Sequence, residues 1–187
     1  MSAGRSEPVA VALSRDVPFG TSIGVRVEGI EYVVWRDESG KAHIWEDRCP
    51  HRGMKLSLGF VRGDRIACLY HGWEYGTDGV CQKIPAHPDL PVPDSIAVGT
   101  FGAVESGGLI WLATEEPAVE VEPLHPVRSM MVEAAVTDVE APEGTHVFLQ
   151  PVSASETMLH ICVEDRADAE TAYLWALGLR TGLEAES

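Results

Sequence analysis

Two short pairs of cysteine and histidine carry the metal-binding residue types of this chain. Cys49-Pro50-His51 is followed, after sixteen intervening residues, by Cys68-Leu69-Tyr70-His71. Together the two pairs supply two thiolates and two imidazoles, which are ligands of zinc and of iron–sulfur centres. The pattern therefore predicts one metal centre that is held by both segments.

The mixed composition of each pair favours one kind of centre. A zinc finger keeps its cysteines together and its histidines together, with the histidine pair on a helix. A [2Fe–2S] cluster can instead take two ligands of each type: Cys49 and Cys68 would hold the iron that stays ferric. His51 and His71 would hold the iron that is reduced. Such a cluster transfers single electrons, so no catalytic residue is expected, and a structural zinc site is the alternative.

Short strands separated by turns must position these pairs. Segments rich in β-branched and aromatic residues predict the strands, and segments such as Asp37–Gly40 predict the turns. The four prolines in residues 85–93 predict a surface loop. This pattern is typical of a mainly β fold, an antiparallel β-sandwich or a small barrel. The expected strands are Val25–Glu28, Glu31–Arg36, Ala42–Glu46, Ile66–Tyr70, Trp73–Tyr75, Ile96–Val98, Phe101–Glu105 and Leu109–Ala113.

The C-terminal part has a different pattern. Residues 115–126 are rich in proline and glutamate and predict a linker, so we expect domains at 9–117 and 118–187. The second part should hold two or three strands and one helix. The helix should start at residues 165–168, where Asp165 and Asp168 place acidic side chains in its first turn. A helix face with Tyr173, Trp175 and Leu177 should pack within the chain or on a partner. The expected strands here are Arg128–Val139, His146–Pro151 and Thr157–Val163, and Ala172, Trp175, Ala176 and Leu179 follow at helical spacing.

Composition and charge limit the function classes. Apolar residues make up 45% of the 187 residues, which is enough for a sizeable core. The sequence contains no run of about 18 apolar residues, which a membrane span would need, and the N-terminal residues lack signal-peptide features. We therefore expect a cytoplasmic protein. The net charge of −15 disfavours nucleic acid as a partner. Bases near the two pairs could form a cationic rim for an acidic redox partner, or be scattered solvated charges: Arg48, Arg52, Lys55, Arg62 and Arg65.

The segment Asp47–Ala86, DRCPHRGMKLSLGFVRGDRIACLYHGWEYGTDGVCQKIPA, resembles the Rieske domain of ring-hydroxylating and O-demethylating oxygenases. With its flanking strands the resemblance covers about residues 9–117. It implies a Rieske-type β-sandwich with Cys49, His51, Cys68 and His71 at the tips of two loops. Around them, backbone or side-chain groups of Gly53, Gly72, Trp73 and Tyr75 should contact the cluster. Pro85 could lie in a loop that covers it, or be an ordinary turn proline.

Two departures from respiratory Rieske proteins bear on the redox potential. The positions of their additional disulfide cysteines correspond here to Met54 and Tyr70. Their serine hydroxyl, which bonds to a cluster sulfur, is replaced by Trp73, although Tyr75 remains. Fewer hydrogen bonds stabilise the reduced cluster less, so we expect a potential near the low end of the Rieske range, around −150 mV.

The oxygenases that the chain resembles also contain a mononuclear iron, held by two His and one carboxylate. Residues 114–187 contain only His125, His146 and His160, without the required spacing. The closest match, Glu143-Gly144-Thr145-His146, has Pro151 where the second His would stand. We therefore expect no mononuclear iron here, and His146 and His160 as ordinary strand residues. Residues 146–170 nonetheless resemble, weakly, late strands of the oxygenase catalytic sheet. Cys81 and Cys162 are expected to fill the core.

Three functions remain open. The first is a Rieske electron carrier that passes single electrons from a flavin or ferredoxin reductase to an acceptor oxygenase. The second is a Rieske subunit of a split aromatic-ring hydroxylating or demethylating oxygenase, whose partner chain holds the mononuclear iron and which could form a homo-trimer. The third is a redox-responsive sensor or assembly protein. No membrane partner is expected.

Overall fold

The computed structural model describes residues 7–113 and 120–185, and these form two compact units. The first, called the ligand-loop unit, consists of residues 17–25 and 31–103. The second, called the helix unit, consists of the described parts of 1–16, 26–30 and 104–187. The linear division expected at residues 117 and 118 lies outside the described residues and stays a prediction.

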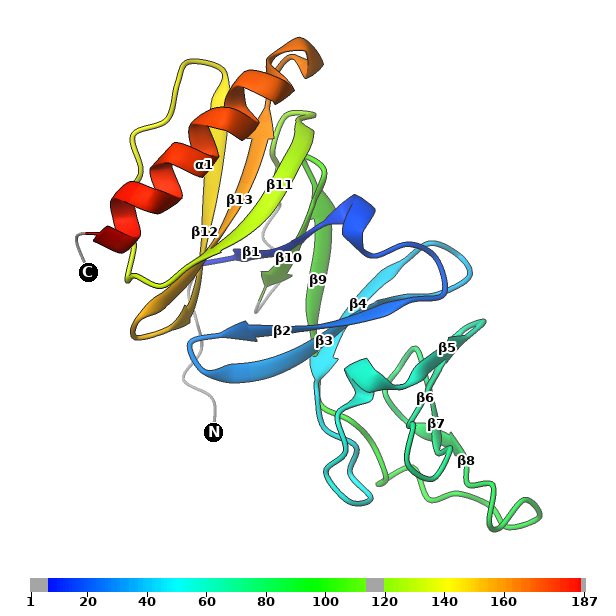
Figure 1. Ribbon diagram of the computed structural model, residues 1–187. Coiled ribbons are helices and arrows are strands. Elements are labelled where there is room, and N and C mark those ends of the chain that lie inside the picture. Colours follow the sequence, from blue (N-terminus) through cyan, green and yellow to red (C-terminus); the bar gives the residue numbers. More distant parts are fainter. Residues whose placement is uncertain (1–6, 114–119, 186–187) are drawn as a thin grey trace. The chain divides into compact units, whose positions relative to one another are not determined.

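Two antiparallel sheets build the ligand-loop unit (Figure 1). In one, β4 (Ala42–Glu46) pairs with β3 (Ile30–Arg36) and with the start of β9 (Thr100–Ser106), and β2 (Ser22–Val27) lies beside β3. The other has the strand order β5-β6-β7-β8, with each strand three residues long. Its strands are β5 (Phe60–Arg62), β6 (Arg65–Ala67), β7 (Glu74–Gly76) and β8 (Cys81–Lys83).

The two Cys/His pairs lie in loops of this unit. The loop with Cys49 and His51 joins β4 to the short 3-10 helix η2 (Leu56–Leu58), which precedes β5. The loop with Cys68 and His71 joins β6 to β7. Large side chains such as Trp35, Trp45 and Tyr75 are fully buried and pack with both cysteines in one core. The core of the unit therefore holds one end of each loop in place.

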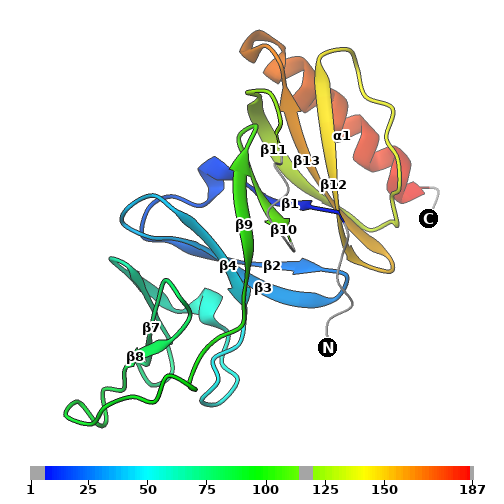
Figure 2. The same cartoon turned by 180° about the vertical axis from the view of Figure 1, so that it is seen from behind.

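The helix unit contains two groups of antiparallel strands. β1 (Val9–Leu13) pairs with β10 (Leu109–Ala113), which lies next to β9. A three-stranded sheet has β13 (Glu156–Val163) between β11 (His125–Val132) and β12 (Thr145–Ser153). The helix α1 (Ala169–Ala185) covers one face of this sheet, and Figure 2 shows the strands in front of it. Two 3-10 helices complete the unit: η1 (Ser14–Asp16) and η3 (Arg166–Asp168), whose first turn is capped by the Asp165 side chain.

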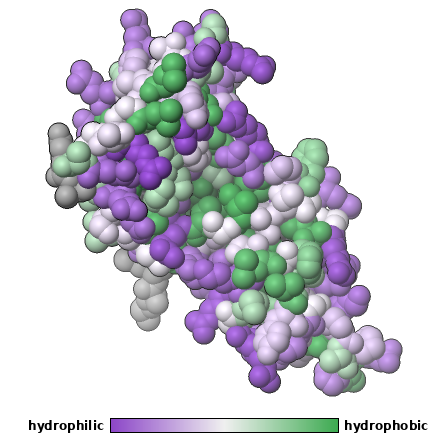
Figure 3. Space-filling model, viewed as in Figure 1, coloured by the Kyte–Doolittle hydropathy of each residue, from purple (hydrophilic) through white to green (hydrophobic). Residues whose placement is uncertain are grey.

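The inner face of α1 differs in part from the expected one. Ala172 and Ala176 are buried, and Trp175 packs against the sheet together with Leu179, as the helical spacing predicts. Tyr173, however, is 42% exposed. Leu174 and Leu177 are also exposed, and Figure 3 shows hydrophobic surface over α1. Of the three residues in the expected face, Trp175 packs within the core of the sheet, while Tyr173 and Leu177 are largely exposed, and packing of this face on a partner stays a prediction.

The mainly antiparallel β fold with one C-terminal helix is confirmed, while three strand predictions need correction. Ile96–Val98 forms only an isolated bridge, between Ala97 and Val80, after a proline-rich stretch. The segment Ile66–Tyr70 leaves the sheet after Ala67, where the ligand loop begins. Arg128–Val139 ends at Val132. Among the described residues, no helix is long and apolar enough to span a membrane.

Candidate iron–sulfur site

The two ligand loops share one backbone design. In the first, the Cys49 N–H donates to the Met54 carbonyl and the Gly53 N–H donates to the Cys49 carbonyl, both at 2.8 Å. In the second, Cys68 donates to Trp73 and Gly72 donates to Cys68, both at 2.9 Å. Gly53 and Gly72 have φ values of +72° and +67°, a left-handed conformation that favours glycine. The glycines therefore close both loops tightly around their cysteines.

A buried carboxylate fastens the base of the first loop. Asp47 is 4% exposed and accepts two hydrogen bonds from Ser57, one from the backbone N–H at 2.7 Å and one from the hydroxyl at 2.6 Å. Cys49 and His51 lie between these two residues in the sequence. The pair therefore limits how far the ends of this loop can separate.

The two cysteine thiols lie together in the core of the unit. Cys49 is 1% exposed and Cys68 is 3% exposed. Burial raises the pKa of the Cys68 thiol, as does the Cys49 thiol beside it. The backbone N–H groups of Tyr70 and His71 hydrogen-bond to the Cys68 sulfur and act in the opposite direction. Such N–H groups are the donors that stabilise a thiolate bound to iron.

Tyr75 adds a side-chain hydrogen bond to this pair. Its hydroxyl oxygen lies 3.0 Å from the Cys49 sulfur, and the whole residue is buried. Burial, and next the hydrogen bond with Cys49, raise the pKa of Tyr75. The phenol therefore keeps its proton and can donate to the sulfur when Cys49 is a thiolate.

The two histidines lie beside each other and nearer to the surface. The ring centroids of His51 and His71 are 4.6 Å apart. The His51 ring stacks on Trp73 at 4.3 Å with an interplanar angle of 6°, and the His71 ring contacts Tyr70 at 3.8 Å. The Nδ1 atom of His51 is buried without a hydrogen-bond partner. Burial of an imidazole nitrogen without a partner costs free energy, unless the nitrogen binds a group such as a metal ion.

These contacts provide a test of whether a [2Fe–2S] cluster fits. Among the residues that the structure describes, no three Cys, His, Asp or Glu side chains form a site for a single metal ion. A binuclear cluster requires a different arrangement, since each iron takes two protein ligands. Here the cysteines form one close pair and the histidines another. With the unpartnered Nδ1 of His51, the donor set fits the cluster.

Proline covers one side of the second loop. A Cβ atom on Gly72 would lie 3.2 Å from the Pro85 ring, so Pro85 lies directly against this loop. Met54 and Tyr70 occupy the expected loop positions, Met54 half-buried and Tyr70 56% exposed. The sequence interpretation missed Asp47 and Ser57. Their only signal was an acidic residue and a serine at the two ends of the loop.

Three of the five bases near the ligand pairs form ion pairs. Arg62 and Arg65 both pair with the buried Glu74, and Lys55 pairs with Glu31. Arg48 and Arg52 are exposed, and no ion pair of either is found in the described parts of the chain. The bases next to the ligands, rather than all five, therefore supply the positive charge at the loop tips.

Three further histidines and the other two cysteines lie on strands. His146 lies on β12 and pairs with Glu164 at 2.9 Å, while His125 is exposed at the start of β11. His160 is 1% exposed on β13, and its Nε2–H donates to the Gln150 side-chain oxygen at 2.8 Å. Cys81 and Cys162 are buried in two cores, as expected. Glu143 and Pro151, the other residues of the weak iron-site match, lie before and on β12. The absence of a mononuclear iron site stays a prediction.

Parts of this chain are similar to a known domain family and to known proteins. The Rieske [2Fe-2S] domain family matches residues 7–94. The oxidoreductase NdmD of Pseudomonas putida is 42% identical over 112 residues, which are 59% of this chain and 19% of that protein. The methylxanthine N1-demethylase NdmA of the same species is 48% identical over 84 residues, which are 45% of this chain and 21% of that protein. The chain thus spans about a fifth of the length of these relatives.

The fold likeness extends further along the chain than the sequence likeness. A crystal structure of dicamba monooxygenase bound to dicamba matches with a TM-score of 0.80 over 97% of this chain and 86% of that chain. The sequences are 15% identical, so this likeness concerns the fold alone. It includes the strands and helix that follow the Rieske domain. Residues 7–94 are a Rieske [2Fe–2S] domain, which implies a [2Fe–2S] cluster, and the two relatives named above are an oxidoreductase and a demethylase.

Proposed function

We propose that this chain transfers single electrons through one [2Fe–2S] cluster held by Cys49, Cys68, His51 and His71. The observation that carries the proposal is the arrangement of two buried thiols and two neighbouring imidazoles in loops of the same design. When bound, the cluster supplies a centre that accepts and releases one electron at a time. No residue of the chain is assigned a catalytic role.

The side chains around the site divide into two groups by burial. The cysteine side lies in the core, where Tyr75 and the backbone N–H groups of Tyr70 and His71 donate to sulfur. These donors offset negative charge on the thiolates. The histidine side is more open, and His71 is exposed. A redox partner would therefore approach the histidine side, through which the distance for electron transfer is shortest.

The charges at the loop tips support an acidic partner. Arg48 and Arg52 flank the first ligand pair and are exposed. Leu69 and Tyr70, next to His71, are 49% and 56% exposed and offer apolar contact area. An acidic flavin or ferredoxin reductase would be guided to such a surface by its charge. An oxygenase catalytic subunit is the proposed acceptor.

A second function is favoured by the fold match beyond the Rieske domain. The sheet of β11, β12 and β13 with α1 lies within the 97% of the chain that matches dicamba monooxygenase. An oxygenase component, whose mononuclear iron lies on another chain or region and which could form a homo-trimer, would use this sheet as part of its catalytic half. The cluster would then pass its electron to the mononuclear iron of the same oxygenase.

Reduction followed by mixing separates the two functions. The dithionite-reduced protein is mixed with oxidised reductase or with a catalytic-domain protein, and the oxidation of the cluster is followed by absorption. A carrier exchanges electrons with the reductase and with the catalytic-domain protein on the time scale of stopped-flow measurements, and it forms no stable complex with either. An oxygenase component co-purifies with the catalytic domain. A protein without iron and acid-labile sulfide, after anaerobic reconstitution with both, would contradict either function.

A further inference from the structure

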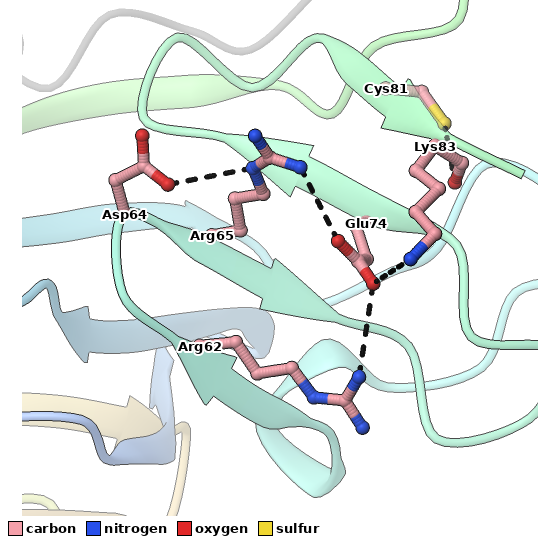
Figure 4. A network of polar contacts seen from close by, with 6 residues as sticks. All are labelled: Arg62, Asp64, Arg65, Glu74, Cys81 and Lys83. Carbon is pink, nitrogen blue, oxygen red and sulfur yellow. Dashed lines mark hydrogen bonds and ion pairs between the residues drawn. The ribbon is translucent and has the colours of Figure 1, made fainter.

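One buried carboxylate connects all four strands of the small sheet that carries the second ligand loop. Glu74 lies on β7 and is only 7% exposed. Its partners are Arg62 on β5, Arg65 on β6 and Lys83 on β8. The nitrogen-to-oxygen distances are 3.8, 3.5 and 3.4 Å, respectively. Figure 4 shows the three cationic groups around the Glu74 carboxylate.

The strand register explains why these side chains meet. Glu74 lies opposite Lys83 on one side and opposite Ala67 on the other. Arg65, two residues before Ala67, is on the same face of β6 and is a diagonal neighbour of Glu74. Arg62 lies opposite Arg65. All four charged side chains therefore lie on one face of the sheet.

The sheet needs such a connection because its strands are short. Each strand has three residues, so few backbone hydrogen bonds hold each pair. A buried carboxylate is stable only with compensating charges, and its removal would leave three cations close together without a counter-charge. Glu74 thus holds the four strands together by attracting the three cationic side chains. Without Glu74 these side chains would repel one another.

β7 and the residue before it contact the first ligand loop, and β7 follows directly on the second. Trp73, just before Glu74, stacks on His51 of the first loop. Tyr75, just after it, bonds to Cys49 of that loop. The second loop starts where β6 ends and finishes where β7 begins. A displacement of β7 would therefore move Trp73 and Tyr75 and widen the loop that holds Cys68 and His71.

We propose that Glu74 is a positioning residue for the cluster: by pairing with Arg62, Arg65 and Lys83 it keeps β7, and with it both ligand loops, in the geometry that retains iron. This inference rests on the proposed cluster ligands. Glu74 itself does not bind iron. Its role is to hold the strand from which Trp73 and Tyr75 contact the first loop.

The test compares two substitutions that each remove one negative charge, one on β7 and one in the turn between β5 and β6. Glu74→Gln removes the shared carboxylate. Asp64→Asn removes an exposed carboxylate whose ion pair within the described parts of the chain is with Arg65, at 3.4 Å. The rate of cluster loss to an iron chelator is followed by visible absorption. We expect at least a tenfold faster loss for Glu74→Gln, a rate within twofold of the unsubstituted protein for Asp64→Asn, and partial rescue by Glu74→Asp.

Amide hydrogen exchange supplies a readout that does not need the cluster. In the metal-free protein, Glu74→Gln should increase exchange at Cys68 and Gly72, whose N–H groups close the second loop. Exchange in β13 of the helix unit should not change, whereas a general loss of stability would raise it throughout. Equal iron loss and equal exchange for Glu74→Gln and Asp64→Asn would overturn the inference.

Two further variants cover the case in which Glu74→Gln does not fold. Arg65→Gln and Lys83→Gln each remove one partner of Glu74, and each should accelerate iron loss at least threefold. Rates equal to that of Asp64→Asn would overturn the inference. If the unsubstituted protein takes up no cluster, the proposed function fails, and the exchange experiment still decides whether Glu74 holds the loop.

Discussion

Replacement of Tyr75 by phenylalanine tests how the chain sets the redox potential. The substitution removes one hydroxyl, whose oxygen lies 3.0 Å from the Cys49 sulfur, and leaves the buried ring in place. No cavity larger than one oxygen atom forms. The effect on the cluster therefore reports on the hydrogen bond itself.

The size of the effect follows from the charge of the acceptor. A hydrogen bond to a charged group contributes roughly 1.5–3 kcal/mol, and the reduced cluster, being more negative, gains more from it than the oxidised one. If the two states differ by about 1 kcal/mol, the potential falls by about 40 mV, because a tenfold change in a one-electron equilibrium corresponds to about 59 mV and about 1.4 kcal/mol. Tyr75→Phe should therefore have the lower potential.

The assay is a redox titration of both proteins at one pH, monitored by visible absorption or circular dichroism. Tyr70→Phe is the matched control: the same hydroxyl is removed from a tyrosine that is 56% exposed and contacts His71 through its ring. Its potential should stay within about 10 mV, since no bond to sulfur is lost. An unchanged or raised potential for Tyr75→Phe would show that the Tyr75 hydroxyl does not stabilise the reduced cluster.

Three other predictions concern stability. Asp47→Asn weakens the hydrogen bonds from Ser57 and should lower the free energy of unfolding by about 1.5–3 kcal/mol in urea titrations; a loss equal to that of an exposed Asp would contradict it. Gly72→Ala should cost about 1–2 kcal/mol because φ is +67° and Pro85 is near, whereas Gly178→Ala, in open space on α1, should stabilise the protein. Burial lowers the pKa of His160 from 6.5 to about 4. The unfolded chain therefore takes up a proton first as the pH falls, and stability should decrease between pH 6.5 and 4, by about 2 kcal/mol from pH 7 to 5, with His160→Gln showing a smaller slope. A His160→Gln protein with the same slope would assign the effect to other groups.

The sequence predicted much of the fold because its signals are local. β-branched runs between glycine turns correspond to β3, β4 and β10, and the helical spacing of Ala172, Ala176 and Leu179 corresponds to the buried side of α1. Gly53 and Gly72 were expected to contact the cluster, which stays a prediction, and both have positive φ in the ligand loops. Each of these features depends on neighbouring residues only.

The contacts that the sequence did not predict join residues that are distant in the chain. Asp47 and Ser57 meet only when the loop closes, so neither stands out in the sequence. Glu74 reads as a surface residue of a short strand, but the register brings it to Arg65 and Lys83. For that reason the bases of the sheet were counted as part of a cationic rim. The outward position of Tyr173 is also non-local, since its ring lies under Arg128 of β11 at 4.9 Å.

The ligands of the cluster can be identified by spectroscopy of the reconstituted protein. The protein is reconstituted anaerobically with iron and sulfide, reduced with dithionite, and examined by metal analysis and by electron paramagnetic resonance with nitrogen hyperfine detection. We expect about two iron and two sulfide per chain, and coupling to two imidazole nitrogens that weakens in His51→Cys and in His71→Cys. Bound zinc, or a cluster whose spectrum has no nitrogen coupling, would contradict this expectation.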